Sequence, residues 1–389
     1  MLDWTFWLEM TIKAFALIMI VLGGFAYLTW YERRALARIQ ARIGPNRVGP
    51  QGLLQPIADA VKLIFKEELK PVKADKIVFF LAPIVTVVPA TVLAAVIPWG
   101  TSFMLFGREI RLYVANVNVG VLYITAIASI AVYGIVLAGW SSNNKYAMLG
   151  GLRASAQMIS YELSLGLCFV TAILLGNSMS LVDIVNAQRD MWFVLVQPVG
   201  ALLFFIVTLA EVSRSPFDMP EAEQELTSGY HVEYSGMKFA LFFMAEYEKM
   251  IIVSAILATL FFGGYREFWF LKDTFLSIDY SWLLGSWHIT NWFLGPLYIF
   301  LKVVVLLFFM IWVRATLPRI RYDRLMSFGW KITLPLSLVI VFFTATGILL
   351  AQDVNPLYIW LTPVLSIVAG MFAVVMIYWS LRRKLHERA

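Results

Sequence analysis

Long apolar stretches, separated by shorter charged segments, run through the whole of this 389-residue chain. A membrane-spanning helix needs about 20 mainly apolar residues, and nine stretches meet that requirement. The pattern therefore predicts an all-α integral membrane protein, a single polytopic membrane domain over residues 1–389 with about nine transmembrane helices. The predicted spans cover residues 10–31, 77–99, 117–140, 154–176, 191–211, 239–263, 292–314, 332–351 and 357–380.

The first of these stretches does not have the pattern of a removable signal peptide. It is too long, the charged Arg33 and Arg34 follow it, and it lacks a cleavage site of small residues. We therefore expect residues 10–31 to form the first span.

The loop after the first predicted span contains an amphipathic segment. From Gly52 to Lys66 the apolar residues recur at helical spacing, whereas Asp59 and Lys62 fall elsewhere on the helix. A helix of this kind lies at the membrane interface, half in the lipid headgroups. Two interpretations fit the pattern: a basic helix on the membrane surface, or one wall of an entrance for a lipid-soluble substrate.

The distribution of Lys and Arg predicts the orientation, because cytoplasmic loops of membrane proteins collect these residues. With the N-terminus outside and the C-terminus cytoplasmic, the inner segments hold 23 of the 31 Lys and Arg residues. The outer loops hold five, and three lie within spans. The net charge of +6 therefore reflects membrane topology, and we expect no nucleic-acid partner.

Composition supports the membrane class and limits the chemistry that the chain performs alone. It is 60% hydrophobic and 14% charged, against about 25% charged residues in soluble domains. The single cysteine, Cys168, excludes an intrachain disulfide and a cysteine-ligated cluster built by this chain alone. The three histidines are scattered, and no phosphate-binding or dinucleotide-binding glycine motif is present. We expect no redox cofactor and no metal site in this chain, so electrons would arrive from a partner.

Several ionisable residues lie inside predicted spans. Glu162 is the only one in the fourth span, where a charged side chain costs about 2.5–3.5 kcal/mol on insertion scales. It should face the bundle interior, either in a buried ion pair that fixes helix packing or in a proton relay. In the sixth span Glu246 and Lys249 are three residues apart, so their spacing predicts partial mutual neutralisation. Lys302 in the seventh span has no such local partner.

The fifth loop is unusually acidic for the side on which basic residues collect. Its carboxylates, with those that flank it, are Glu211, Asp218, Glu221, Glu223, Glu225 and Glu233. Crowded carboxylates repel one another, which raises some of their pKa values and lets them pass protons near neutral pH. The alternative is an ordinary solvated acidic loop, but Pro216, Phe217 and Pro220 favour a packed one. The basic seventh loop, from Arg314 to Arg324, is expected to face it.

Six blocks of sequence are long and specific enough to indicate a family. They are Glu-Arg-Arg at 32–34 with the run 39–59, Ser-Asn-Asn-Lys-Tyr at 142–146, Ala-Gln-Met-Ile-Ser-Tyr-Glu at 156–162, the run 210–226, Glu-Tyr-Ser-Gly at 233–236, and the run 312–323. From about residue 32 to residue 336 the chain resembles the NuoH-type membrane subunit of bacterial complex I, the proton-translocating NADH:quinone oxidoreductase. The mitochondrial form of that family is NADH dehydrogenase subunit one.

The resemblance implies a membrane subunit that forms a quinone tunnel entered from the bilayer, and an acidic path that couples quinone reduction to proton pumping. The implied quinone-binding residues are Arg33, Arg42, Asp59, Arg214, Phe217, Asp218 and Arg314. The implied proton path consists of Glu162, Glu211, Glu221, Glu223, Glu225 and Glu246.

The resemblance also implies partners and a location. Quinone would be the substrate, with no covalently bound cofactor in this chain, and the iron–sulfur clusters and FMN would belong to partner subunits. The expected neighbours are the peripheral-arm quinone-site and iron–sulfur subunits, small membrane-arm subunits and the lipid of the bacterial cytoplasmic (inner) membrane.

Two features depart from the family pattern: the predicted ninth span, 357–380, and a long aromatic outer segment, 264–291. Three other functions compete with the one implied. A related hydrogenase or ferredoxin-linked complex has similar subunits, although the full Gly-Pro-Asn and Pro-Phe-Asp blocks favour quinone. A stand-alone ion transporter would often show an internal repeat, which this sequence lacks. A passive scaffold would have no use for carboxylates inside the membrane.

Overall fold

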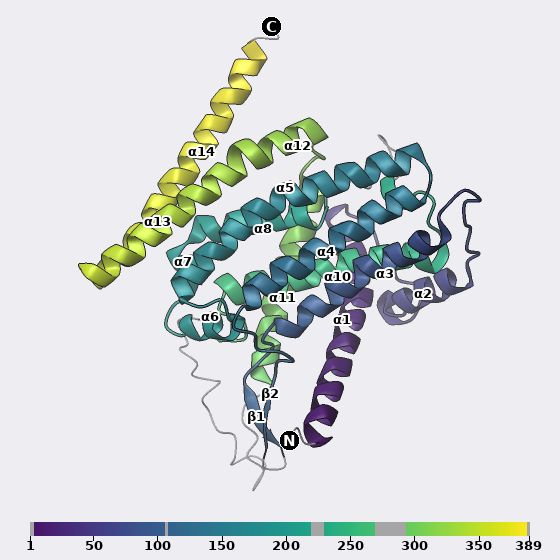
Figure 1. Cartoon of the computed structure of the whole chain (residues 1–389), viewed down its shortest axis with the longest axis horizontal. Helices are drawn as coiled ribbons and strands as arrows, with labels where there is room; N and C mark the ends of the chain where they lie inside the picture. Colours follow the sequence, from purple (N-terminus) through teal and green to yellow (C-terminus); the bar gives the residue numbers. More distant parts are fainter. Residues whose placement is uncertain (1–3, 106–107, 219–228, 269–292, 387–389) are drawn as a thin grey trace.

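The computed structural model describes residues 4–105, 108–218, 229–268 and 293–386, and helices form nearly all of its regular structure (Figure 1). The predicted all-α membrane class is therefore confirmed. The long helices are α1 (Trp4–Ile39), α3 (Lys76–Leu93), α4 (Gly120–Ser141), α5 (Lys145–Gly176), α10 (Gly236–Phe261), α11 (Leu294–Thr316), α13 (Leu334–Asp353) and α14 (Leu361–His386).

Shorter elements connect these helices. They are α2 (Gln55–Phe65), α6 (Leu181–Ala187), α7 (Phe193–Val196), α8 (Pro198–Glu211), α12 (Tyr322–Phe328), the 3-10 turns Pro50–Gly52, Ala94–Val96, Gly229–His231 and Pro356–Trp360, and the π-helical turn Gly329–Thr333. An antiparallel hairpin, β1 (Ser102–Leu105) with β2 (Arg108–Arg111), pairs Ser102 with Arg111. The sequence pattern did not predict this hairpin.

Within the described residues, seven helices are long and apolar enough to cross a membrane. The last of the seven covers Leu357–Met376, in the region of the predicted ninth span. Two further predicted spans fall on other elements. The stretch 191–211 is divided between α7 and α8, because Pro198 supplies no N–H and Gln197 is not helical. The stretch 239–263 falls on α10, which carries three charges in its middle.

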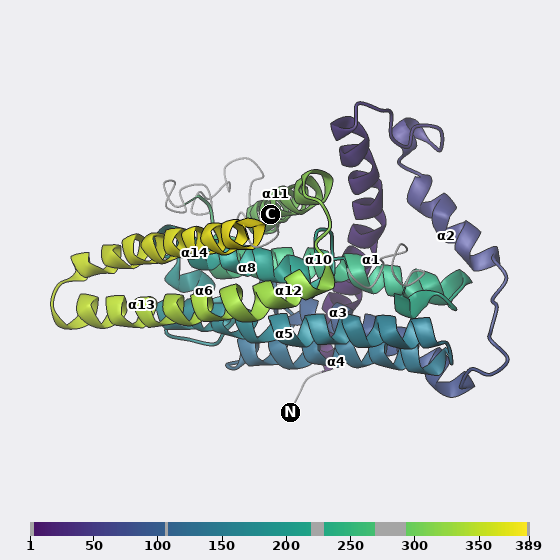
Figure 2. The ribbon, with the colours of Figure 1, turned by 90° about the horizontal axis from the view of Figure 1, so that it is seen from above.

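The helices form a bundle with two outlying parts. Helices α3, α4 and α5 lie side by side, and α10 packs against α3 and α11 (Figures 1 and 2). The hairpin of α13 and α14 projects at one end of the bundle, and α2 lies beyond α1 at the other (Figure 2). The start of α1 and the β-hairpin lie on one side of the molecule, whereas the end of α14 lies on the opposite side (Figure 1).

Close packing of small residues brings α4 against α5. A Cβ atom added to Gly139 would lie 2.7 Å from the backbone oxygen of Ala147, so only glycine fits at that position. Small residues at helix interfaces are typical of membrane bundles, since van der Waals contact and hydrogen bonds, rather than exclusion from water, hold the helices together.

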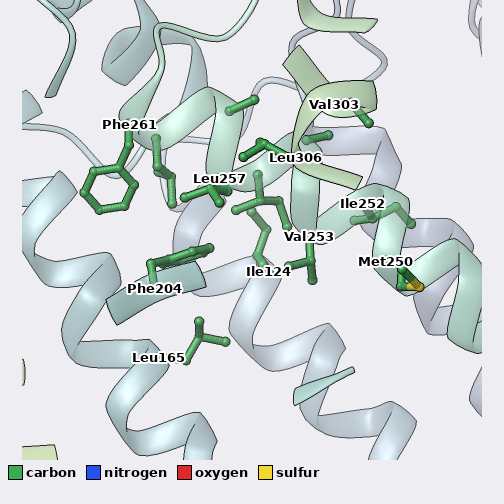
Figure 3. Packing of buried hydrophobic residues seen from close by; sticks show 14 of the residues in the cluster. Ile124, Leu165, Phe204, Met250, Ile252, Val253, Leu257, Phe261, Val303 and Leu306 are labelled. Atoms are coloured by element: carbon green, nitrogen blue, oxygen red, sulfur yellow. The ribbon is translucent and has the colours of Figure 1, made fainter. Parts of the chain in front are cut away.

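The main core surrounds α10. Its side chains Leu257 and Phe261 pack beside residues of four other helices: Ile124, Leu165, Phe204, Val303 and Leu306 (Figure 3). Helix α10 is therefore the central element of the bundle, and its charged residues lie at the centre of the structure.

Buried hydrogen bonds fix the α13–α14 hairpin to the bundle. The Gln197 side chain donates to the Thr344 hydroxyl over 2.6 Å, and the Thr362 hydroxyl donates to the backbone oxygen of Val196 over 3.0 Å. Both contacts involve the broken segment between α7 and α8. The break in the fifth predicted span thus makes the Gln197 side chain and the Val196 backbone oxygen available to bind α13 and α14.

Candidate functional site

A network of buried and half-buried ions joins three helices to the loop after α8. The Arg214 Nε atom lies 2.7 Å from Glu246 Oε1 on α10, and its Nη1 atom lies 3.5 Å from Glu32 Oε1 on α1. Arg314 of α11 pairs with the same Glu32 oxygen. The Arg214 guanidinium also stands 4.2 Å from the centroid of the Tyr247 ring. Two carboxylates and two guanidinium groups balance in charge, which lowers the penalty for burying each of them.

A second group of ions lies between α8 and α10. The Lys249 Nζ atom is 2.6 Å from Glu211 Oε1 and 3.1 Å from the Glu211 backbone oxygen, at the C-terminus of α8. Both side chains are buried. The spacing on α10 predicted that Lys249 and Glu246 would neutralise each other, but the structure gives each a close partner on another element. Neighbouring helices offer fully formed ion pairs that the sequence spacing does not reveal.

Glu162 of α5 belongs to the second group. Its carboxylate accepts a hydrogen bond from the Ser129 hydroxyl of α4, and its charge acts electrostatically on Glu211. Glu162 thus faces a neighbouring helix and a second carboxylate. This agrees with the expectation that it faces the bundle interior, because a charge facing lipid is costly.

A small cavity lies between the two groups. It has a volume of about 40 Å³, which is room for two or three water molecules. Its polar lining includes Ser213, Glu246 and Lys249, and the rest is mainly apolar side chains of α3, α4, α5 and α10. The cavity therefore places a carboxylate of the first group and the ammonium of the second on one shared space.

The loop after α8 is packed as far as the structure describes it. Gln157 of α5 donates from its amide to the backbone oxygens of Ala210 and Phe217, each over 2.8 Å. The backbone N–H of Ile320 donates to the oxygen of Pro216, which follows a cis peptide bond. The Phe217 ring stacks on Phe328. These contacts confirm the predicted packed loop up to residue 218.

The seventh loop contacts this packed loop, as predicted. Arg319 Nη2 lies 2.7 Å from Asp218 Oδ2, and the Asp218 side chain is buried. Arg314 of the same basic segment pairs instead with Glu32. The two basic residues therefore serve different carboxylates. Glu221, Glu223 and Glu225 lie outside the described residues.

The amphipathic helix α2 presents its apolar side to the surroundings. None of its residues is buried. It is attached to α1 by an ion pair of 2.5 Å between Arg33 Nη1 and Asp59 Oδ2, and the turn before it accepts a hydrogen bond from the Trp30 indole at the backbone oxygen of Gln51. Arg42, in contrast, is exposed after the end of α1, where its Nε donates to the Gln40 side chain.

Sequence reasoning did not identify several of these site residues. Glu32 opens a family block, yet its burial between two arginines depends on α1 continuing to Ile39. Gln157 and Arg319 act through contacts more than fifty residues apart, which no local pattern shows.

Glu248 on α10 is a further buried carboxylate. It is fully buried, and its Oε2 accepts a hydrogen bond of 2.9 Å from the Thr91 hydroxyl of α3. Its Oε1 has no hydrogen-bond partner among the described residues. Lys302 of α11 has a different environment, since its ammonium donates to the backbone oxygens of Phe262, Gly264 and Arg266.

No group of three or more His, Cys, Asp and Glu side chains in the described part of the chain could hold a metal ion. The charged groups that the site brings together are ion pairs and carboxylates. Such an arrangement can take up, hold and release protons, and it can respond to a charge that appears nearby.

Comparison with known proteins gives a consistent result. A family model described as NADH dehydrogenase matches residues 12–345. The H-type subunit of NADH-quinone oxidoreductase from Thermomicrobium roseum is 47% identical over 348 residues, which are 87% of this chain and 95% of that protein. An H-type subunit of the same enzyme from Syntrophobacter fumaroxidans is 47% identical over 355 residues, 90% and 99% of the two chains. One from Geobacter sulfurreducens is 48% identical over 351 residues, 87% and 94%.

Proposed function

The chain belongs to the NADH dehydrogenase family, and from this premise we propose that it is the quinone-binding membrane subunit of a proton-translocating NADH:quinone oxidoreductase. It acts as one subunit of that oxidoreductase and not alone. Electrons from NADH would pass through FMN and iron–sulfur clusters of partner subunits. At the end of that route a quinone takes up two electrons and two protons to become a quinol.

The proposed orientation places the N-terminus outside and the C-terminus in the cytoplasm of a bacterial inner membrane. Two observations support it. The predicted inner segments hold most of the Lys and Arg residues. The start of α1 and the end of α14 also lie on opposite sides of the bundle (Figure 1). The packed loop after α8 and the basic seventh loop would then face the partner subunits that deliver electrons.

Helices α1, α2 and α10 would frame the entrance for quinone. All three contact one another, and α2 offers an apolar side suited to the lipid boundary, where a quinone resides. Arg33 and Asp59 would hold this entrance together, with Arg42 at its rim. Farther along the chain Arg214, Phe217, Asp218 and Arg314 would line or support the quinone chamber.

The proposed proton path runs through Glu211, Glu162 and Glu246, and the family resemblance adds Glu221, Glu223 and Glu225 to it. The observation that carries this proposal is the pair of buried ion groups on one cavity. Quinone reduction creates transient negative charge, and charges that are partly shielded from water are screened only weakly. A change at the chamber can therefore shift protons among these carboxylates at a distance.

A pull-down tests the identity of the complex. The tagged chain would be isolated in mild detergent and assayed for non-haem iron, flavin and inhibitor-sensitive NADH:quinone activity. All three together support the proposal. Iron without flavin would indicate a ferredoxin-linked or hydrogenase-type complex, and intact protein with neither would indicate an ion transporter.

Two substitutions test the site assignments. Glu211→Gln and Asp218→Asn keep the shape of each side chain but remove its charge. We expect both to lower NADH:quinone activity in a complex that still assembles, as judged by NADH:ferricyanide activity, which does not need the quinone site. Normal turnover and normal pumping in both variants would contradict these assignments.

A further inference from the structure

Lys249 holds a position that the proposed proton path does not explain. Its ammonium group is bonded to Glu211, yet the side chain also lines the cavity that Glu246 lines. We propose that Lys249 is a positioning residue that moves between Glu211 and Glu246, and that this movement decides when Glu211 can accept a proton. The inference rests on the proposed function, because it assigns a role within the same path.

The contact between Lys249 and Glu211 suggests that the ammonium group moves before Glu211 takes up a proton. An ammonium group 2.6 Å away stabilises the ionised form of a buried carboxylate, because it compensates the charge and donates a hydrogen bond to it. The other oxygen, Glu211 Oε2, has no hydrogen-bond partner among the described residues and is the open position for a proton. Because the contact with Lys249 opposes protonation of Glu211, movement of the ammonium away from the carboxylate would favour the arrival of a proton there.

The structure provides a destination for the ammonium. Lys249 and Glu246 are three residues apart on α10, so their side chains share a face of the helix. Both line the cavity, and a lysine head on a flexible four-carbon stem can turn within it. Ser213 lines the same space, and its hydroxyl has no hydrogen-bond partner in the described part of the chain. This hydroxyl can accept a hydrogen bond from the ammonium during the turn.

The first ion group can release Glu246 to receive Lys249. Arg214 lies between two carboxylates, 2.7 Å from Glu246 and 3.5 Å from Glu32. A small shift of its guanidinium towards Glu32 would leave Glu246 to the ammonium. Lys249 keeps its own proton throughout. One proton enters from the path and binds the Glu211 carboxylate, and its later release to the next acceptor lets the ammonium return.

A static role is the competing explanation. Lys249 could serve only to neutralise Glu211 during folding, in which case Glu211 stays ionised whether the quinone is oxidised or reduced. The two explanations differ in the protonation of Glu211 during turnover. They also differ in whether the effect of replacing Lys249 depends on Glu246. In the resting arrangement each of the two residues has a close partner on another element.

Infrared difference spectroscopy of the purified complex measures the first distinction. Spectra would be recorded before and after reduction by NADH in the presence of decylubiquinone, with the wild-type chain and with Glu211→Gln. We expect a carboxylic-acid C=O band on reduction that is absent from Glu211→Gln. A wild-type spectrum without any band that depends on Glu211 would overturn the inference.

A double-variant cycle measures the second distinction. Proton translocation per NADH oxidised would be followed in liposomes for Lys249→Gln, Glu246→Gln and the double variant, with NADH:ferricyanide activity to confirm assembly. If Lys249 acts through Glu246, the double variant loses no more coupling than the worse single variant. Losses that multiply would overturn the inference. Lys13→Gln is the matched control, since Lys13 pairs with Glu9 on α1 and lies outside the path.

Failure of the proposed function would look different. A wild-type complex without inhibitor-sensitive quinone reduction would contradict the function itself, before any variant is compared. If Lys249→Gln does not assemble, the infrared comparison of the wild-type chain with Glu211→Gln can still overturn the inference.

Discussion

Glu32 is the carboxylate on which the first ion group depends, and Glu32→Gln is the substitution that tests this directly. The side chain is 2% exposed and serves both Arg214 and Arg314. The amide keeps the shape of the side chain but removes the charge. Two guanidinium groups would then face the single carboxylate of Glu246.

The expected loss can be worked from the geometry. At 3.5 Å and an effective dielectric constant of about 20, the Arg214 pair alone corresponds to about 5 kcal/mol. Hydrogen bonds to the amide would return about 1 kcal/mol for each bond that forms. Measured losses for breaking a buried pair are about 3–5 kcal/mol, so we expect Glu32→Gln to reduce stability by about 3–4 kcal/mol.

The assay is the thermal stability of the assembled complex, followed as the NADH:quinone activity that remains after heating in detergent. Glu109→Gln is the matched control, because Glu109 and Arg111 form an exposed pair at 3.8 Å, and water screens such a pair so that its loss changes stability little. If Glu32→Gln is as stable as Glu109→Gln, the argument from the buried network is refuted.

Three further predictions concern residues around the site. Burial raises the pKa of Tyr234 from 10.0 to about 12. The stability that depends on its protonated form is therefore complete below pH 10 and is lost as the pH rises through about 12. In alkaline thermal melts, Tyr234→Phe should lack the fall in stability that Tyr234 causes. Gly139→Ala should lower stability by about 1–3 kcal/mol, since its Cβ would meet the Ala147 oxygen; wild-type melting would contradict this. Glu248→Gln should leave assembly and proton translocation close to wild type, because the amide keeps the shape of the side chain and its oxygen still accepts the hydrogen bond from the Thr91 hydroxyl; lost pumping would place Glu248 on the path.

The sequence predicted the helices in which apolar residues recur at regular spacing over many residues. The helical spacing from Gly52 to Lys66 predicted a helix where α2 lies, at Gln55–Phe65, although the pattern could not show that a separate 3-10 turn precedes it. The first predicted span ended at residue 31, whereas α1 continues to Ile39. Hydropathy ends a span at its first charges, but the helix continues because Glu32 and Arg33 find partners.

The parts of the site that the sequence missed depend on contacts between distant segments. Spacing on α10 placed Glu246 and Lys249 on one face but could not show that α8 and the loop after it supply closer partners. The same limit applies to Arg319, whose partner Asp218 lies 101 residues away in the chain. Local patterns identify which residues are costly in a membrane, and only the packed bundle shows which charges neutralise them.

The exposed apolar side of α2 has a consequence for the lipid around the protein. This helix contacts α1 and α10, with the Arg33–Asp59 pair among the contacts, and its apolar side lies where the headgroup boundary acts on it. A thinner or thicker membrane changes where the headgroup boundary lies relative to the spanning helices. The helix would follow that boundary while α1 stays fixed in the bundle. Membrane thickness would thereby adjust the width of the proposed quinone entrance, and lipid chain length would become a determinant of the rate at which quinone enters.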